Sequence, residues 1–275
     1  MRKRIACLHD LASFGGAALM NIIPIMYSSG IEVCPIPTSL FTSHGALSGS
    51  KSFDNSGFMK EYTAQYKQLQ LNFDGIYLGL FTSEDQIKEA DYFLQSFSKN
   101  NTLVLMDPIM GDNGKLYNFM NESNVIALRR LIKKAKIITP NLTEACIILG
   151  RPYKEDIDKN EIEEILVSLS SFGPEQVIIT SVPSQGFISS YIYNKLDNRY
   201  GVIKGEKRPG SYPGTGDAYT AALMAHLLNG RSLIDSAFEA TKMIENAIDM
   251  IIKNGYNPME GLPIAEYLSG LKNSK

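Results

Sequence analysis

Short apolar runs alternate along the chain with segments in which apolar residues recur at helical spacing. This alternation is typical of the α/β class, in which a central, mostly parallel sheet carries helices on both faces. Pro24 lies inside the first helical segment and is expected to kink or split it. The predicted strands are Ile5–Leu8, Ile31–Ile36, Gly75–Leu80, Thr102–Met106, Lys136–Thr139 and Gln176–Thr180, and the predicted helices are Gly16–Ser28, Gly57–Leu71, Glu84–Lys99, Glu122–Lys134, Leu142–Leu149 and Asn160–Phe172.

The periodicity changes in the C-terminal third of the chain. Phe187–Tyr193 and Tyr200–Ile203 have the pattern of two strands joined by a short turn, which predicts a small antiparallel element. Two helices, Asp217–Leu228 and Leu233–Lys253, and a short C-terminal helix follow. Because no low-complexity linker or internal repeat interrupts these elements, we predict a single domain over residues 1–275.

Composition argues against several classes of function. The formal net charge is −2 at pH 7, so no overall basic field attracts nucleic acid or acidic membranes. No stretch approaches the roughly 18 apolar residues of a membrane span. The apolar run after Met1–Arg4 is shorter than the h-region of a signal peptide, which has about 7–15 residues. Cys7, Cys34 and Cys146 are far apart in apolar surroundings, which favours buried free thiols. We therefore predict a cytoplasmic protein.

The turn Pro213–Asp217 precedes a segment rich in small apolar residues, which predicts a buried helix. Gly214 and Gly216 allow the backbone to approach a ligand closely, and the helix N-terminus suits an anion such as a transferring phosphoryl group. Asp217 could then remove a proton from the attacking hydroxyl group. A helix that simply begins with Asp after a tight turn explains the same residues equally well.

Acidic and amide side chains follow two more predicted strands, at the ends where ligands collect in open α/β sheets. Asp107 and Asp112 could face Mg²⁺ directly or through water, or could be solvated loop carboxylates. Asn141 and Glu144 have the spacing of a helix capping box. Glu144 would also suit a divalent cation that lies between it and nucleotide phosphates.

Two N-terminal segments, Leu8–Gly16 and Pro37–His44, combine polar groups with aromatic rings after predicted strands. A flat polar ring substrate would suit them, through hydrogen bonds and ring packing. His9 is expected to face the sheet and His226 to lie in a buried helix, so neither is given a role. The candidate substrate contacts are Asp10, Phe14, Thr38, Phe41 and His44.

Together these motifs resemble those of the pyridoxal/pyridoxamine kinases, members of the ribokinase-like superfamily, over nearly the whole chain. They are the first segment ending in Gly-Gly, then Pro-Thr-Ser-Leu-Phe-Thr-Ser-His, Asp-Pro-Ile-Met-Gly-Asp, Thr-Pro-Asn-Leu-Thr-Glu-Ala and Gly-Thr-Gly-Asp. The last three are shared with hydroxymethylpyrimidine kinases, whereas Thr38–His44 favours the pyridoxal branch. The resemblance implies phosphorylation of a hydroxymethyl group on a pyridine ring with ATP and Mg²⁺, and a homodimer.

The resemblance also implies roles for individual residues. Asp217 would be the base, and Asp107 and Glu144 would arrange Mg²⁺ and the ATP phosphates. The loop Gly205–Tyr212 would close over the nucleotide, or be an ordinary solvated loop. The backbone amides of Gly214, Thr215 and Gly216 would form an anion hole; Asp10, Phe14, Thr38, Ser39, Phe41 and His44 would contact the vitamin; and Asn141, Thr180, Ser181 and Lys207 would contact the nucleotide.

The chain departs from the family pattern at several positions. Asp10 and Leu11 stand where many pyridoxal kinases have Ser and His, Gly79–Ser83 replaces Gly-Tyr-Leu-Gly-Ser, and Thr180 or Ser181 stands where a Lys is usual. A carboxylate at position 10 favours an amine-bearing substrate such as pyridoxamine. The alternatives are a hydroxymethylpyrimidine kinase and a non-catalytic binding relative. The missing Lys supports the second of these. A Rossmann dehydrogenase is disfavoured because no Gly-x-Gly-x-x-Gly follows the first strand.

Overall fold

The computed structural model describes residues 2–184 and 186–273. Its strands are β1 (Arg4–Ala12), β2 (Glu32–Phe41), β3 (Ser52–Asp54), β4 (Gly75–Leu78), β5 (Leu103–Met106), β6 (Gly111–Asp112), β7 (Lys115–Leu116), β8 (Ile137–Ile138), β9 (Gln176–Ser184), β10 (Phe187–Asn194) and β11 (Arg199–Glu206). The main sheet has the order β11-β10-β9-β8-β5-β4-β1-β2-β3, with a parallel centre and antiparallel strands at both edges. β6 and β7 form a separate hairpin.

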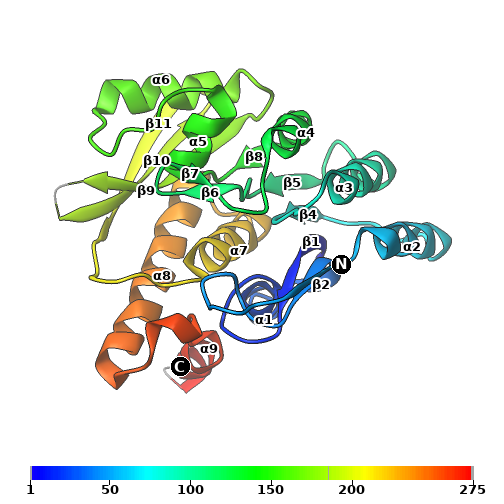
Figure 1. Ribbon diagram of the computed structural model, residues 1–275, viewed down its shortest axis with the longest axis horizontal. Coiled ribbons are helices and arrows are strands. Elements are labelled where there is room, and N and C mark those ends of the chain that lie inside the picture. Colours follow the sequence, from blue (N-terminus) through cyan, green and yellow to red (C-terminus); the bar gives the residue numbers. More distant parts are fainter. Residues whose placement is uncertain (1, 185, 274–275) are drawn as a thin grey trace.

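Helices cover both faces of this sheet (Figure 1). One face carries α2 (Ser56–Gln68), α3 (Glu84–Phe97), α4 (Glu122–Ile132), α5 (Leu142–Leu149) and α6 (Lys159–Ser170). The other carries α1 (Leu19–Ser28), α7 (Thr215–Leu228), α8 (Leu233–Asn254) and α9 (Ile264–Asn273), with the 3₁₀ helix η1 (Pro258–Glu260) between the last two. The predicted α/β class with a C-terminal antiparallel element is confirmed. Among the described helices, none is long and apolar enough to cross a bilayer.

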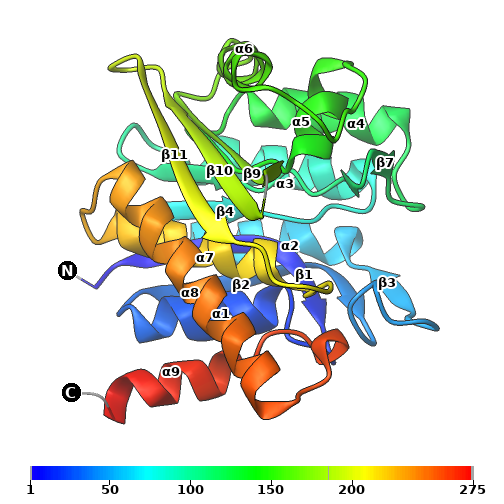
Figure 2. The ribbon, with the colours of Figure 1, turned by 90° about the vertical axis from the view of Figure 1, so that its left-hand side faces the viewer.

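The long antiparallel strands β10 and β11 rise beside α8, away from the parallel centre (Figure 2). They confirm the antiparallel pair expected from the sequence. Three short strands, β3, β6 and β7, were not expected. Pro24 was expected to kink or split the first helix; it does not split it, because α1 continues through Pro24 without a break. The predicted free thiols are confirmed, with Cys7 and Cys146 buried and Cys34 half-buried.

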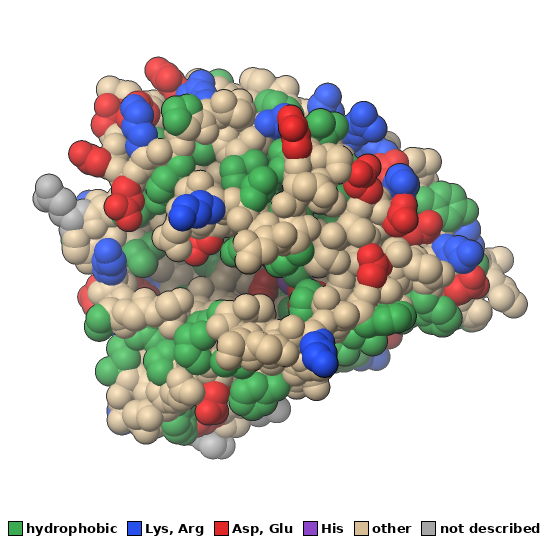
Figure 3. Space-filling view, in the orientation of Figure 1, with side chains coloured by type: hydrophobic (Ala, Val, Ile, Leu, Met, Phe, Trp, Pro, Cys, Tyr) green, Lys and Arg blue, Asp and Glu red, His purple; other side chains and the backbone are tan. Residues whose placement is uncertain are grey.

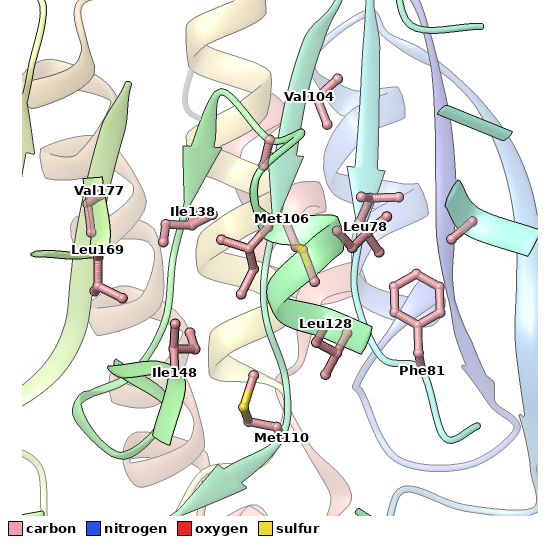
Figure 4. Close-up of a cluster of buried hydrophobic side chains, with 14 of the residues drawn as sticks. Leu78, Phe81, Val104, Met106, Met110, Leu128, Ile138, Ile148, Leu169 and Val177 are labelled. Atoms are coloured by element: carbon pink, nitrogen blue, oxygen red, sulfur yellow. The ribbon is translucent and has the colours of Figure 1, made fainter. Parts of the chain in front are cut away.

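The strand register places apolar side chains in a row beneath the carboxyl edge of the sheet. Leu78 of β4 pairs with Met106 of β5, and Met106 pairs with Ile138 of β8. All three are fully buried, and Figure 4 shows them with Leu128 and Phe81 in one cluster. Burying each such side chain contributes about 1.5–3 kcal/mol to folding. The residues that directly follow these strands are therefore held on a rigid support.

Candidate active site

The candidate site residues gather at the carboxyl ends of the central strands, where α7 begins (Figure 1). His9 and Asp10 lie near the end of β1, Asp107 directly follows β5, and Asn141 caps α5 after β8. Figure 3 shows that the surface is hollowed near the middle of this face, with acidic and histidine side chains visible inside the hollow. Asp217 reaches the same place from the first turn of α7.

The turn that starts α7 requires glycine for two reasons. Gly214 has a φ of +81°, a left-handed conformation that other residues rarely adopt. A Cβ at this position would also collide with the carbonyl oxygen of Gly16 and lie 2.7 Å from Nδ2 of Asn21. Asn21 donates to the carbonyl oxygens of Gly16 (2.7 Å) and Gly214 (3.2 Å), so it fixes the two glycine turns against each other. The only sequence sign of this role is an Asn in an otherwise apolar helix.

The N-terminus of α7 presents unpaired backbone donors. The first backbone hydrogen bond of the helix runs from the N–H of Ala218 to the carbonyl oxygen of Gly214. The N–H groups of Thr215, Gly216 and Asp217 therefore have no partner within the helix, and they lie at the positive end of its dipole. Gly216 is exposed, so an anion can reach these donors.

Asp217 is held by two contacts. Its Oδ2 accepts a hydrogen bond from the N–H of Ala18 at 2.6 Å, and its Oδ1 lies 3.2 Å from Nε2 of His9. The His9 N–H is not aimed at this oxygen well enough for a hydrogen bond, so the contact is electrostatic. Burial acts to raise the pKa of Asp217, but His9 and the Ala18 N–H outweigh it and lower the pKa. Asp217 is therefore ionised at neutral pH and able to accept a proton.

His9 lies between Asp217 and Asp10, although no role was predicted for it from the sequence. Its Nδ1 is 2.8 Å from Oδ1 of Asp10. Burial acts to lower the pKa of His9, but Asp10 and Asp217 outweigh it and raise the pKa to about 10. In a neutral ring, Nδ1 could instead accept a hydrogen bond from the N–H of Asp10, which lies 3.0 Å away. The carboxylates on both sides favour the imidazolium form over this arrangement. The sequence signal was a His-Asp pair at the end of a strand.

Asp107 is buried on the other side of the α7 N-terminus. Its Oδ2 accepts a hydrogen bond from the hydroxyl of Thr220 at 3.3 Å. Burial and the charge of Asp217 together raise the pKa of Asp107 to about 7. A carboxylate in this state binds a cation readily, because the cation supplies the opposite charge that the protein interior lacks.

Glu144 is buried and accepts two backbone hydrogen bonds, from Met110 to Oε1 (3.1 Å) and from Asn141 to Oε2 (2.8 Å). Asn141 in turn accepts from the N–H of Glu144, so the predicted capping box is confirmed. Burial and the charge of Asp107 raise the pKa of Glu144. A buried carboxyl group whose pKa is raised by a second carboxylate fits a divalent cation nearby.

No cluster of three or more His, Cys, Asp or Glu side chains suited to a metal ion occurs in the described part of the chain. Mg²⁺ would therefore need ligands beyond Asp107 and Glu144, and phosphate oxygens and water commonly supply them. Asp112 is exposed and hydrogen-bonds Asn113.

Several candidate substrate contacts are engaged inside the protein. β2 extends to Phe41, so Thr38 and Ser39 lie within a strand. The hydroxyl of Thr38 donates to the carbonyl oxygen of Leu80 at 2.7 Å, and Ser39 is hydrogen-bonded to Thr82 and Gln86. These hydroxyl groups therefore attach β2 to the segment after β4 and to α3. A further two side chains, Phe14 and Phe41, are exposed and half-buried respectively.

His44 also has a partner within the protein. Its Nδ1 accepts from the N–H of Ala46 at 3.3 Å, so Nε2 carries the proton and donates to the carbonyl oxygen of Met259 at 2.8 Å. Its ring lies where a Cβ of Gly15 would stand. His44 thus ties the loop after β2 to η1.

The other candidate nucleotide contacts lie on β9 and on the loop after β11. Thr180 donates its N–H to the carbonyl oxygen of Pro140 at 2.8 Å, next to Asn141, and Ser181 is exposed. Lys207 is exposed on the loop after β11. The neighbouring Arg208 holds this loop to α8 through Asp249, at 2.7 and 3.0 Å.

Comparison with known proteins identifies relatives. The family described as phosphomethylpyrimidine kinase matches residues 49–260. A Bacteroides thetaiotaomicron protein, described as a candidate phosphomethylpyrimidine kinase and crystallised in an orthorhombic form with pyridoxal, is 38% identical, with a TM-score of 0.95 over 99% of this chain and 96% of its own. Pyridoxal kinase from Lactobacillus plantarum is 26% identical, with a TM-score of 0.90 over 98% and 96% of the two chains.

Arabidopsis thaliana pyridoxal kinase is 32% identical over 192 residues, which are 66% of this chain and 60% of the plant protein. A Schizosaccharomyces pombe relative is 28% identical, and the match spans 55% of its length. The chain thus spans less than two thirds of the length of these two relatives.

Proposed function

The chain belongs to the phosphomethylpyrimidine kinase family, and we propose that it transfers the terminal phosphoryl group of ATP to the hydroxymethyl group of pyridoxal, pyridoxamine or pyridoxine. One observation carries this proposal. A half-buried, ionised Asp217 lies in the same helical turn as the open N–H groups of Thr215 and Gly216. A proton acceptor and an anion site side by side are what phosphoryl transfer to an alcohol needs. The similarity to a protein crystallised with pyridoxal supports the choice of ring.

Each group of site residues has its own role in the proposed reaction. Asp217 takes the proton from the hydroxymethyl group as its oxygen forms a bond to the terminal phosphorus, and the bond to the bridging oxygen breaks to release ADP. The N–H groups at the start of α7 stabilise charge on the transferring group. Asp107 and Glu144 would hold Mg²⁺, which neutralises phosphate charge when bound. The binding of ATP to Asn141, Thr180, Ser181 and Lys207 belongs to the same proposal.

A panel assay with ATP and Mg²⁺ tests the proposed function. We expect ADP release with pyridoxal, pyridoxamine or pyridoxine to exceed the release with hydroxymethylpyrimidine. The last compound is the substrate of the second candidate function, which the family description favours. A higher kcat/KM for the pyrimidine would replace the first proposal by the second. No ADP release above background with any compound would favour a non-catalytic binding protein.

Asp10 is the residue that we expect to set the preference among these vitamers. It is 7% exposed and shares its carboxylate with His9. In Asp10→Ser, kcat/KM for pyridoxamine should fall about tenfold relative to pyridoxine, since a hydrogen bond to a charged group contributes about 1.5–3 kcal/mol. Steady-state kinetics with both substrates measures the ratio. Asp10→Asn, which keeps the shape, should show the same relative loss, and an unchanged ratio in both variants contradicts the assignment.

We further propose that the whole chain acts as one kinase domain, that two copies form a homodimer, and that the protein works in the cytoplasm. The free thiols of Cys7, Cys34 and Cys146 agree with a reducing compartment.

A further inference from the structure

We propose that His9 is a positioning residue for the reaction: its imidazolium, held between Asp10 and Asp217, keeps Asp217 ionised and in place as the proton acceptor. This inference rests on the proposed function. It differs from a purely structural role because the removal of His9 should change the proton affinity of Asp217, and not only the stability of the fold.

The geometry leaves the His9 ring little freedom. The side chain is 1% exposed, and a Cβ on Gly79 would collide with Cδ2 and Nε2 of the ring. The ring of Tyr77 stands edge-on to it, with the centroids 5.7 Å apart and the planes at 90°. The contact of Nδ1 with Asp10 at 2.8 Å then turns Nε2 toward Asp217, 3.2 Å away. The absence of a side chain at Gly79 is therefore part of the arrangement.

The charges around His9 are of one sign. Burial keeps the Cys7 thiol and the Tyr77 hydroxyl neutral, because it raises the pKa of each. The negative charge of Asp217 raises the pKa of Asp107, and His9 acts in the opposite direction on both carboxylates. The titratable groups that face His9 are Asp10 and Cys7 on β1, Tyr77 on β4, Asp107 after β5 and Asp217 on α7.

Without the imidazolium, Asp217 would be a half-buried carboxylate that feels the charge of Asp107 and has no protein cation in contact with it among the described residues. Burial and a neighbouring negative charge both raise the pKa of a carboxyl group. The fraction of Asp217 that is ionised near pH 6 would fall, and catalysis at that pH would fall with it. Catalysis should return at higher pH, where the carboxyl group loses its proton.

The variant His9→Gln tests this inference through the pH profile of kcat/KM. We expect the acidic limb to move upward by about one pH unit or more, which lowers kcat/KM about tenfold on that limb. Activity should recover toward the wild-type value as the pH rises. His226→Gln, a half-buried histidine on α7, is the matched control and should leave the limb in place. An unchanged limb in His9→Gln overturns the inference.

A second variant moves the ring without removing it. Gly79→Ala places a methyl group against His9 and should shift the same limb upward, whereas Gly57→Ala, which adds a methyl group in open space, should not. If Gly79→Ala folds and its limb matches the wild type, the placement of the ring does not matter and the inference fails.

A third measurement separates this inference from the proposed function. In ¹⁵N spectra of the histidine-labelled wild type without substrate, His9 should stay doubly protonated until the pH approaches 10, as its raised pKa requires. His226, whose pKa burial lowers, should lose its proton below the usual value near 6.5. Titration of His9 below pH 7 overturns the inference even if the protein is an active kinase. An imidazolium at pH 9 in a protein that transfers no phosphate would leave the charge arrangement standing and the proposed function rejected.

Discussion

Replacing Asp217 by Asn lowers kcat/KM about 10²–10⁴-fold, the usual contribution of a general base. The amide keeps the size of the side chain and can still accept the N–H of Ala18, but it cannot take a proton from the substrate. The loss should lie in kcat, because the N–H groups at the start of α7 and the carboxylates of Asp107 and Glu144 remain. Steady-state kinetics measure the loss in kcat, and calorimetric titration with ATP measures whether the affinity for the nucleotide is kept.

The matched control for this variant is Asp85→Asn. Asp85 also lies in the first turn of a helix, α3, but it is exposed and pairs with Lys88 on the surface. Its removal should change neither kcat nor the affinity for ATP. Turnover by Asp217→Asn within about threefold of the wild type would remove Asp217 as the base. Loss of ATP binding together with turnover would instead mark it as a nucleotide contact.

Gly214→Ala is expected to damage both the fold and the site. Alanine in the left-handed conformation costs about 1–2 kcal/mol, and forcing a methyl group into a packed contact adds about 1–3 kcal/mol. We therefore expect the free energy of unfolding to fall by about 2–5 kcal/mol in urea titrations. Relief of the collision with Gly16 would move the N–H groups of α7, and a displacement near 1 Å can lower kcat about 10²-fold.

Gly230→Ala is a close control, because Gly230 has a φ of +85° and nothing within 4 Å of the added methyl group. It should lose only the backbone contribution and keep its kcat. Equal losses of stability in the two variants, with normal kcat in Gly214→Ala, would show that the approach of Gly16 to Gly214 has no catalytic importance.

Much of this molecule could be predicted from the sequence, because its signals are local. The ribokinase-like α/β architecture is confirmed, since strands and helices leave their period in the chain. The capping box of Asn141 and Glu144 needs only a spacing of three residues. Asp107 and Gly214 could be chosen as candidates because each stands next to an element boundary, where ligands and tight turns occur.

Hydrogen bonds between residues far apart in the chain leave no local pattern in the sequence. Ala18 and Asp217 are 199 positions apart, and Asn21 and Gly214 are 193 apart. The contact of His9 with Asp217 depends on the same distant approach of β1 to α7, so the His-Asp pair in the sequence could not reveal it alone. Thr38 was expected in a loop because β2 was predicted to end at Ile36, but pairing with β1 and β3 carries the strand on to Phe41. Register between strands is set by tertiary contacts.

The missing family Lys leaves the positive charge at the nucleotide phosphates to other groups. Thr180 and Ser181 carry no charge, so under the proposed function Mg²⁺ and the N-terminus of α7 would have to supply more of it. Lys207 is the nearest exposed cation in sequence to the turn at Gly214, on the loop that Arg208 anchors to α8.

The central claim is phosphoryl transfer to a hydroxymethyl group, and the fate of the terminal phosphate of ATP tests it most directly. The wild-type protein is incubated with γ-³²P-labelled ATP, Mg²⁺ and pyridoxal, and the labelled products are separated. We expect label in a phosphorylated vitamin, formed one for one with ADP, and about 10²–10⁴-fold less of it with Asp217→Asn. Label that stays in ATP or appears only as inorganic phosphate, with every vitamer and with hydroxymethylpyrimidine, would contradict it.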